Sequence, residues 1–138
     1  MFIVVDASIW VARLVSEDVF YEPVKEWMFT RLGEDDQFLA PSLLLAEIGG
    51  AISRRTRPSL GLMAIEQVQS LPGLQLVEME NLLLQEAAQL AAQLGLRGAD
   101  STYVALAARL DLPLMTLDID QKERATKRIK VLEISDKL

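Results

Sequence analysis

The chain has 138 residues, a length typical of one domain, and 51% of them are hydrophobic, enough for a substantial core. It contains no cysteine and no histidine, which excludes disulfide scaffolds, thiolate metal sites and catalysis by imidazole. The formal net charge is −6, although basic residues gather near residues 54–57 and 122–130. We expect neither a membrane span nor a signal peptide, because no apolar run is long enough and no basic segment precedes the first one.

Short apolar runs alternate with longer segments of helical periodicity along the whole chain. Most runs are apolar on both faces, as buried parallel strands are. The predicted strands are residues 2–5, 37–40, 74–78, 114–117 and 130–134. The predicted helices are residues 8–15, 22–32, 41–55, 59–70, 80–94, 100–110 and 120–127. Pro41 is a start signal for the third helix, and Gly33 and Gly95 are predicted to end the second and fifth.

Strands separated by helices imply a mostly parallel sheet with right-handed crossovers. The sequence contains no repeat, linker or low-complexity segment. We therefore expect a single α/β domain over residues 1–138. Its predicted architecture is a three-layer α/β/α arrangement around a mostly parallel, five-stranded sheet.

Asp6 ends the first predicted strand, in the stretch VVDASIW. Open parallel sheets bind ligands beyond the carboxyl ends of their strands, which makes this aspartate a candidate site residue. A polar residue at a strand end can equally cap the following helix, either directly or through Ser8. Taken alone, the local pattern favours the capping interpretation.

Glu47 is the only charged residue between Pro41 and Arg54, in the stretch PSLLLAEIGGAI. On a helix it shares a mostly apolar stripe, and a carboxylate is rarely buried without a partner. Gly49 and Gly50 together cost about 1–2 kcal/mol of helix stability relative to alanine. Close approach of another backbone or of a ligand would explain them. We favour a ligand role for Glu47 over a solvated helix edge.

Two further acids lie in the second half of the chain. Asp100 falls near the start of a predicted helix, where capping or the helix dipole would explain it equally well. Asp118 follows the fourth predicted strand, with Thr116 before it and Asp120 after it. Either of the last two aspartates can cap the next helix, so the sequence does not decide which of them faces the site.

The four acids are predicted to converge at one edge of the sheet. Carboxylates brought close together repel each other and raise each other's pKa values, and a divalent cation removes this conflict. Oxygen ligands without histidine or cysteine suit Mg²⁺ or Mn²⁺ and disfavour zinc and copper. Such a site polarises a phosphate and activates a bound water. The predicted metal ligands are Asp6, Glu47, Asp100 and Asp118.

The stretches VVDASIW, PSLLLAEIGGAI and GADSTYVALAARLDLPLMTLD, in this order and at this spacing, resemble the PIN-domain family. The resemblance is to the VapC-type toxins of toxin–antitoxin pairs in particular, and it spans nearly the whole chain. It implies a parallel sheet covered by helices on both sides. It also implies that Asp6, Glu47, Asp100 and Asp118 form the acidic quartet around Mg²⁺ or Mn²⁺. Ser8 and Thr116 match hydroxyl positions beside the acids, and whether Asp120 is also a ligand stays open.

The activity implied by this resemblance is that of a cytoplasmic, metal-dependent endoribonuclease, the toxin of a type II pair. Metal-activated water would attack in line and leave 5′-phosphate and 3′-hydroxyl ends. Candidates for contact with the RNA backbone, for which ordinary solvated surface is an equal interpretation, are Arg54, Arg55, Arg57, Arg97 and Lys122.

The resemblance also implies a homodimer and a small antitoxin partner, which would wrap a hydrophobic groove and insert an Arg or Lys at the acidic site. Aromatic residues around the first two helices are candidates for that groove, and we expect about half of them to be core instead. These residues are Trp10, Phe20, Tyr21, Trp27 and Phe29.

Two alternatives without nuclease activity fit the sequence less well. Phosphotransferases of the haloacid-dehalogenase kind need a second aspartate two residues after the nucleophile, and that position is Ser8. A receiver-like partner module needs adjacent acids near the first strand and a lysine after the last one. Here Asp6 stands alone, and Lys130 begins the last predicted strand.

Overall fold

The computed structural model describes residues 1–135, in which helices and strands alternate in the predicted order. The strands are β1 (Phe2–Val5), β2 (Gln37–Pro41), β3 (Leu74–Val77), β4 (Leu114–Met115) and β5 (Val131–Leu132). The helices are α1 (Ala7–Leu14), α2 (Tyr21–Gly33), α3 (Leu44–Arg55), α4 (Pro58–Gln69), α5 (Asn81–Leu94), α6 (Gly98–Leu110) and α7 (Ile119–Ala125). Across residues 1–135, no helix is both long enough and apolar enough to cross a membrane.

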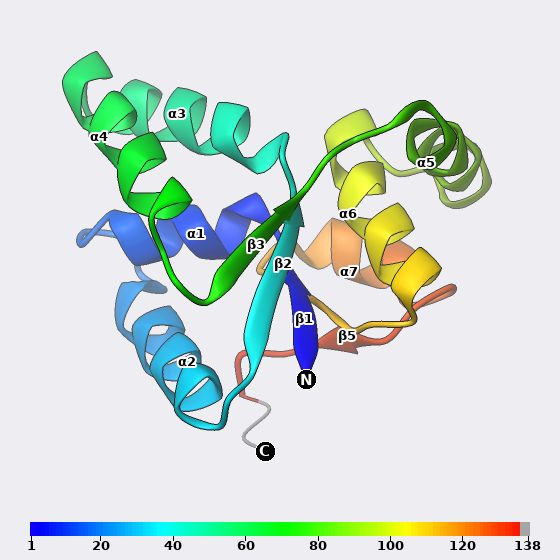
Figure 1. Cartoon of the computed structure of the whole chain (residues 1–138), viewed down its shortest axis with the longest axis horizontal. Helices are drawn as coiled ribbons and strands as arrows, with labels where there is room; N and C mark the ends of the chain where they lie inside the picture. The colour runs from blue at the N-terminus through cyan, green and yellow to red at the C-terminus, as the bar shows by residue number, and fades with distance from the viewer. Residues whose placement is uncertain (136–138) are drawn as a thin grey trace.

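The five strands form one parallel sheet in the order β3-β2-β1-β4-β5. In Figure 1, α1 to α4 lie on one side of this sheet and α5 to α7 lie on the other, which makes three layers. The predicted α/β/α architecture is therefore confirmed, with a sheet that is wholly parallel. The strand order reverses between β1 and β4, and ligands bind at such switch points in open α/β sheets.

Apolar side chains on both faces of β1 explain its central position. Residues 3–5 are completely buried between the two helical layers. On the side of α1 and α2, Trp10 meets the edge of Phe38 with ring centroids 6.0 Å apart, and Trp27 stacks on Phe38 at 5.6 Å. Both tryptophans are buried and belong to the core, which leaves fewer aromatic residues for a surface groove.

Several element boundaries differ from the predicted ones. Pro41 ends β2, where it is paired with Val77, and α3 begins three residues later at Leu44. Gly33 is the last helical residue of α2, with Glu34 as the C-cap. By contrast, Gly95 caps α5 as predicted, with a positive φ of 70° that favours glycine.

The fourth strand is shorter than predicted because its polar end bonds to side chains. The amide of Leu117 donates to Ser8 Oγ at 3.0 Å, and the amide of Asp118 donates to Thr116 Oγ1 at 3.0 Å. These amides are therefore withdrawn from strand pairing, and β4 stops at Met115. The same bonds fix the loop that carries Asp118 against the end of β1.

Candidate functional site

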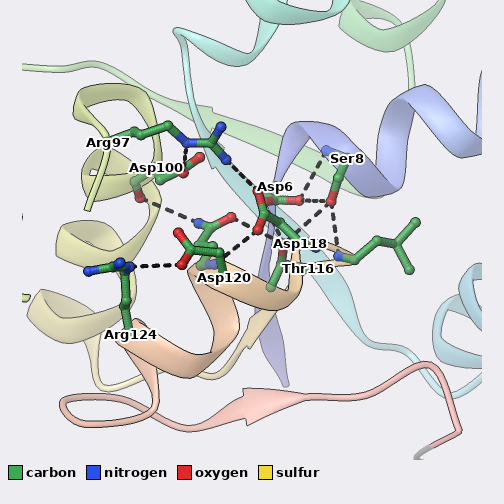
Figure 2. Close-up of polar contacts among 10 residues, drawn as sticks. Asp6, Ser8, Arg97, Asp100, Thr116, Asp118, Asp120 and Arg124 are labelled. Atoms are coloured by element: carbon green, nitrogen blue, oxygen red, sulfur yellow. Dashed lines mark hydrogen bonds and ion pairs between the residues drawn. The ribbon is translucent and has the colours of Figure 1, made fainter. Parts of the chain in front are cut away.

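Asp6 follows β1 directly and is nearly completely buried, with 4% of its surface exposed. Its Oδ1 accepts hydrogen bonds from the Ser8 amide at 3.0 Å and from Ser8 Oγ at 2.5 Å, and thereby caps α1. Its Oδ2 accepts a bond from Thr116 Oγ1 at 2.7 Å (Figure 2). Burial raises the pKa of Asp6 to about 7, although these hydrogen bonds oppose the rise. The residue is both a helix cap and an unusually basic carboxylate at the switch point.

Asp100 and Asp118 are joined by one guanidinium group. Arg97 Nε donates to Asp100 Oδ2 at 3.0 Å, and its Nη2 donates to Asp118 Oδ2 at 2.5 Å (Figure 2). Asp100 lies in the first turn of α6, which begins at Gly98, two residues before the predicted start. Asp118 caps α7 by accepting the Gln121 amide at 3.0 Å. Arg97 is thus the cation that balances these two acids in this structure.

Glu47 is half-buried on α3 and reaches across to α6. Its Oε1 accepts a hydrogen bond from the Tyr103 hydroxyl at 2.6 Å. Burial raises the pKa of Glu47, and the tyrosine bond partly opposes the shift. Burial and the facing carboxylate raise the pKa of Tyr103 above its usual range, so the phenol stays a hydrogen-bond donor. This hydrogen bond holds the glutamate side chain against α6, the helix that also carries Asp100.

The four predicted acids act on one another through Asp100. Its negative charge adds to the rise in pKa of both Asp6 and Glu47. Burial raises the pKa of Asp100 itself, Arg97 opposes that rise, and the charge of Asp118 reinforces it. The fold therefore gathers the acids near the carboxyl edge of β1 and β4, where the charge of Asp100 disfavours ionisation of Asp6 and Glu47.

The donor chemistry of this cluster fits a hard divalent cation, since it offers carboxylate and hydroxyl oxygens only. As placed, however, no three acidic side chains among residues 1–135 are close enough to hold a metal ion together. Arg97 explains part of this, because it bridges Asp100 and Asp118. A cation at these two acids and the Arg97 guanidinium therefore compete for the same oxygens.

A cleft of about 600 Å³ extends from the acids between α1 and α3. One end carries acidic and hydroxyl groups, and the other end carries two arginines, an aromatic ring and the carboxylate of Asp18, which pairs with one of those arginines. Its floor is formed by small side chains of both helices. The residues that mark the two ends are Ser8, Glu47 and Asp118 at the first, and Phe20, Arg54 and Arg55 at the second.

The structure separates the basic residues that the sequence grouped as RNA-contact candidates. Arg54 and Arg55 line the cleft that leads to the acids, whereas Arg57 does not, and its Nε donates to a neighbouring serine hydroxyl at 3.1 Å. Lys122 forms an ion pair with Glu133. Arg97 lies at the acids themselves, where its guanidinium pairs with two aspartates.

Asp120 lies in the first turn of α7 and is largely exposed. Its Oδ1 accepts a hydrogen bond from Arg124 Nε at 3.0 Å (Figure 2). Its charge contributes to the raised pKa of Asp100, so it belongs to the periphery of the cluster.

Two residues of the site were missed by sequence reasoning. Tyr103 carried a signal, because it follows Asp100 by one helical turn in an alanine- and leucine-rich helix and its hydroxyl needs a partner when buried. Nothing in the sequence around Gln121 indicated a role in the site. It is fully buried, its Oε1 accepts a bond from Thr116 Oγ1 at 3.1 Å, and its Nε2 reaches the Asp100 carbonyl at 3.5 Å.

A second, larger hollow of about 1380 Å³ lies between α1, α2 and the amino ends of β2 and β3. Phe29 lines it with 82% of its surface exposed, beside Leu32 and Leu71. Of the remaining aromatic candidates, Phe20 lines the smaller cleft, at the end away from the acids, and Tyr21 is half-buried at the start of α2.

Comparisons with known proteins agree with this architecture. The family model of the PIN domain matches residues 3–127. The toxin VapC20 of Mycobacterium tuberculosis, described as cleaving the sarcin-ricin loop, is 16% identical with a TM-score of 0.73 over 88% of this chain and 93% of that one. DNA-bound VapBC of Salmonella typhimurium is 15% identical with a TM-score of 0.75, covering 97% and 98%. FitAcB of Neisseria gonorrhoeae is 18% identical with a TM-score of 0.71, covering 98% and 99%. No curated protein sequence gave a significant match.

Proposed function

The chain belongs to the PIN-domain family, and on that premise we propose that it is a Mg²⁺- or Mn²⁺-dependent endoribonuclease. The observation that carries the proposal is the arrangement of three aspartates at the switch point of the sheet, where Asp6 is buried and the Arg97 guanidinium bridges the other two. A cluster of mutually repelling carboxylates is unfavourable unless cations neutralise it. In a metal-dependent enzyme that acts on a phosphodiester, such carboxylates would bind the metal ion.

We assign the acids distinct tasks in this reaction. Asp6, Asp100 and Asp118 would hold the cation, which when bound polarises the phosphate and lowers the pKa of a water ligand. Glu47, with its raised pKa, is suited to orient the attacking water and to take up its proton. Ser8 and Thr116 would keep Asp6 in place, and in-line attack would leave 5′-phosphate and 3′-hydroxyl ends.

We further propose that the chain is the toxin of a toxin–antitoxin pair. Support comes from fold neighbours that include the VapBC and FitAB complexes. The hollow beside Phe29 offers an exposed apolar surface for an antitoxin segment. A homodimer belongs to the same proposal, and light scattering that finds only monomer at micromolar concentration would count against it.

The test compares Asp6→Asn and Asp100→Asn with Asp111→Asn, an exposed aspartate outside the cluster. Asparagine at position 6 can still cap α1, so the fold should be retained. We expect the first two variants to lose about a hundredfold or more in cleavage of single-stranded RNA in Mg²⁺ or Mn²⁺, and the control to cleave like the parent. Parent-like cleavage by both cluster variants, with intact circular dichroism, would reject the assignment.

A further inference from the structure

The cleft between α1 and α3 carries a positive charge as well as the acids, and the metal site alone gives no reason for that charge. Glu47, Ala51 and Arg54 line it from α3 at positions i, i+4 and i+7, so one helical face carries both the acid and a cation. The rise of an α-helix puts these charged residues about 10 Å apart along the axis. No ion pair joins the two side chains within residues 1–135, so the cation is available to a ligand that spans the cleft.

Arg54 has no hydrogen-bond or ion-pair partner within residues 1–135, whereas its neighbour Arg55 has one. Arg55 Nη1 donates to Asp18 Oδ2 at 2.9 Å. A Cβ added at Gly50 would lie 3.1 Å from Arg54 Nη1, so the free guanidinium lies back along α3, over this glycine and toward the acids. Glycine at position 50 leaves room for that placement.

An aromatic ring completes the same end of the cleft. Phe20 lines it and is 41% exposed. Asp18 ties the backbone at Phe20 to α3, because its Oδ1 accepts the Phe20 amide at 2.8 Å while its Oδ2 accepts a hydrogen bond from Arg55. An unpaired guanidinium and an exposed ring that line the same cleft provide what a single-stranded nucleotide needs: a charge for the phosphate and a surface for the base.

We propose that Arg54 binds a phosphate flanking the scissile one in single-stranded RNA and that Phe20 stacks on the adjacent base. The proposal rests on the proposed ribonuclease function and adds the path of the strand, from the acids along α3 toward the start of α2. Arg55 belongs to the scaffold of this subsite, through its pair with Asp18, and Arg57 lies outside it.

The experiment measures binding of a short, fluorescein-labelled, single-stranded RNA pool of randomised sequence to the full chain. Ca²⁺ replaces Mg²⁺, so that binding is followed apart from cleavage. Arg54→Ala should weaken binding about tenfold, as expected for the loss of one charge-assisted contact. The slope of log K against log salt should fall by about 0.7, the share of one phosphate on a single strand. In Mg²⁺, the same variant should raise KM and leave kcat unchanged.

Matched variants separate the contributions. Arg57→Ala removes the same charge outside the cleft and should leave affinity and salt slope as in the parent. Phe20→Leu should weaken binding about tenfold without changing the slope, because stacking involves no counterion release. Arg54→Gln serves as a second variant if Arg54→Ala loses its thermal transition.

Two results would overturn the proposal in different ways. If the parent binds and cleaves RNA, and Arg54→Ala and Arg57→Ala bind it equally well, then the subsite is wrong and the ribonuclease proposal survives. If the parent neither binds nor cleaves RNA, the proposed function fails and the subsite fails with it.

Discussion

The Asp6 carboxylate caps helix α1, and it also lies near enough to Asp100 for the charge of that residue to raise its pKa. Its pKa is raised to about 7 from an unfolded value of 3.8. Folding therefore favours the protonated form, and the stability gained from it is present below about pH 4 and lost as the pH rises through 7. In a metal-free protein at neutral pH, this residue should oppose folding.

Asp6→Asn should therefore stabilise the metal-free protein above pH 7 by about 2–4 kcal/mol, since the shift corresponds to roughly three pKa units. The advantage over the parent should shrink toward pH 4. Urea unfolding in EDTA across this range measures it, with Asp111→Asn as the control. A difference that does not vary with pH would show that Asp6 is not the titrating group.

Arg97 supplies from within the chain the positive charge that a metal would supply. Because 70% of its side chain is exposed, its two ion pairs are weak individually and open to exchange. Arg97→Ala should consequently strengthen Mn²⁺ binding at pH 8 by about fivefold, the size of a modest ion pair. Isothermal titration calorimetry in the absence of RNA measures the change.

Arg124→Ala is the matched control, since Arg124 pairs with Asp120 at the edge of the cluster and does not bridge the two acids. Its Mn²⁺ affinity should equal that of the parent. Weaker Mn²⁺ binding by Arg97→Ala would mean that the arginine positions Asp100 and Asp118 for the metal instead of competing with it.

At the scale of elements, α3, which carries Glu47 and Arg54, packs closely against α4. A Cβ at Gly61 would lie 2.8 Å from the Gly49 carbonyl oxygen, and one at Gly49 would lie 2.7 Å from Ile65 Cδ1. The unusual pair of glycines in α3 thus has two explanations: Gly49 admits α4, and Gly50 makes room for Arg54. The two glycines predicted close approach of another group to this helix, but the sequence did not indicate which group packs against which glycine.

Gly61→Ala should destabilise the protein by about 1–3 kcal/mol, because the backbone of α3 cannot yield to the added methyl group as a side chain could. The higher helix propensity of alanine than of glycine would offset only part of that loss in stability. Gly33→Ala is the control, since a Cβ there meets nothing within 4 Å. Denaturant titration of both variants tests the packing, and equal stabilities would show that the helices can separate at little cost.

The order of the elements could be predicted because the buried strands are apolar and the helix ends carry turn residues. Pro41 misled the prediction, since a proline at a helix start and one at a strand end share the same local signal. Asp6 and Asp118 could be identified as candidates by their positions after strands, and Glu47 as the lone charge on an apolar helix. The role of Arg97 and the buried Gln121 could not, because both follow from tertiary contacts between segments that are distant in sequence.

For the whole molecule, the negative net charge has to be reconciled with the binding of RNA. The chain carries a formal charge of −6 and gathers carboxylates at the edge where an RNA phosphate would have to lie. A field of this sign repels nucleic acid, and only the cationic end of the cleft attracts it. Neutralisation of the acidic edge by a divalent cation should therefore be a condition for tight RNA binding as well as for cleavage.

The parent should accordingly bind labelled single-stranded RNA at least about tenfold more tightly in Ca²⁺ than in EDTA at equal ionic strength, since the cation removes the repulsion that the acids exert on phosphates. Fluorescence anisotropy measures this ratio. Asp100→Asn lowers the negative charge at the centre of the cluster, so its affinity in EDTA should rise and its response to Ca²⁺ should shrink. Equal affinity of the parent with and without Ca²⁺ would indicate that the RNA binds away from the acids. It would contradict the proposal that the strand runs from the acids along α3.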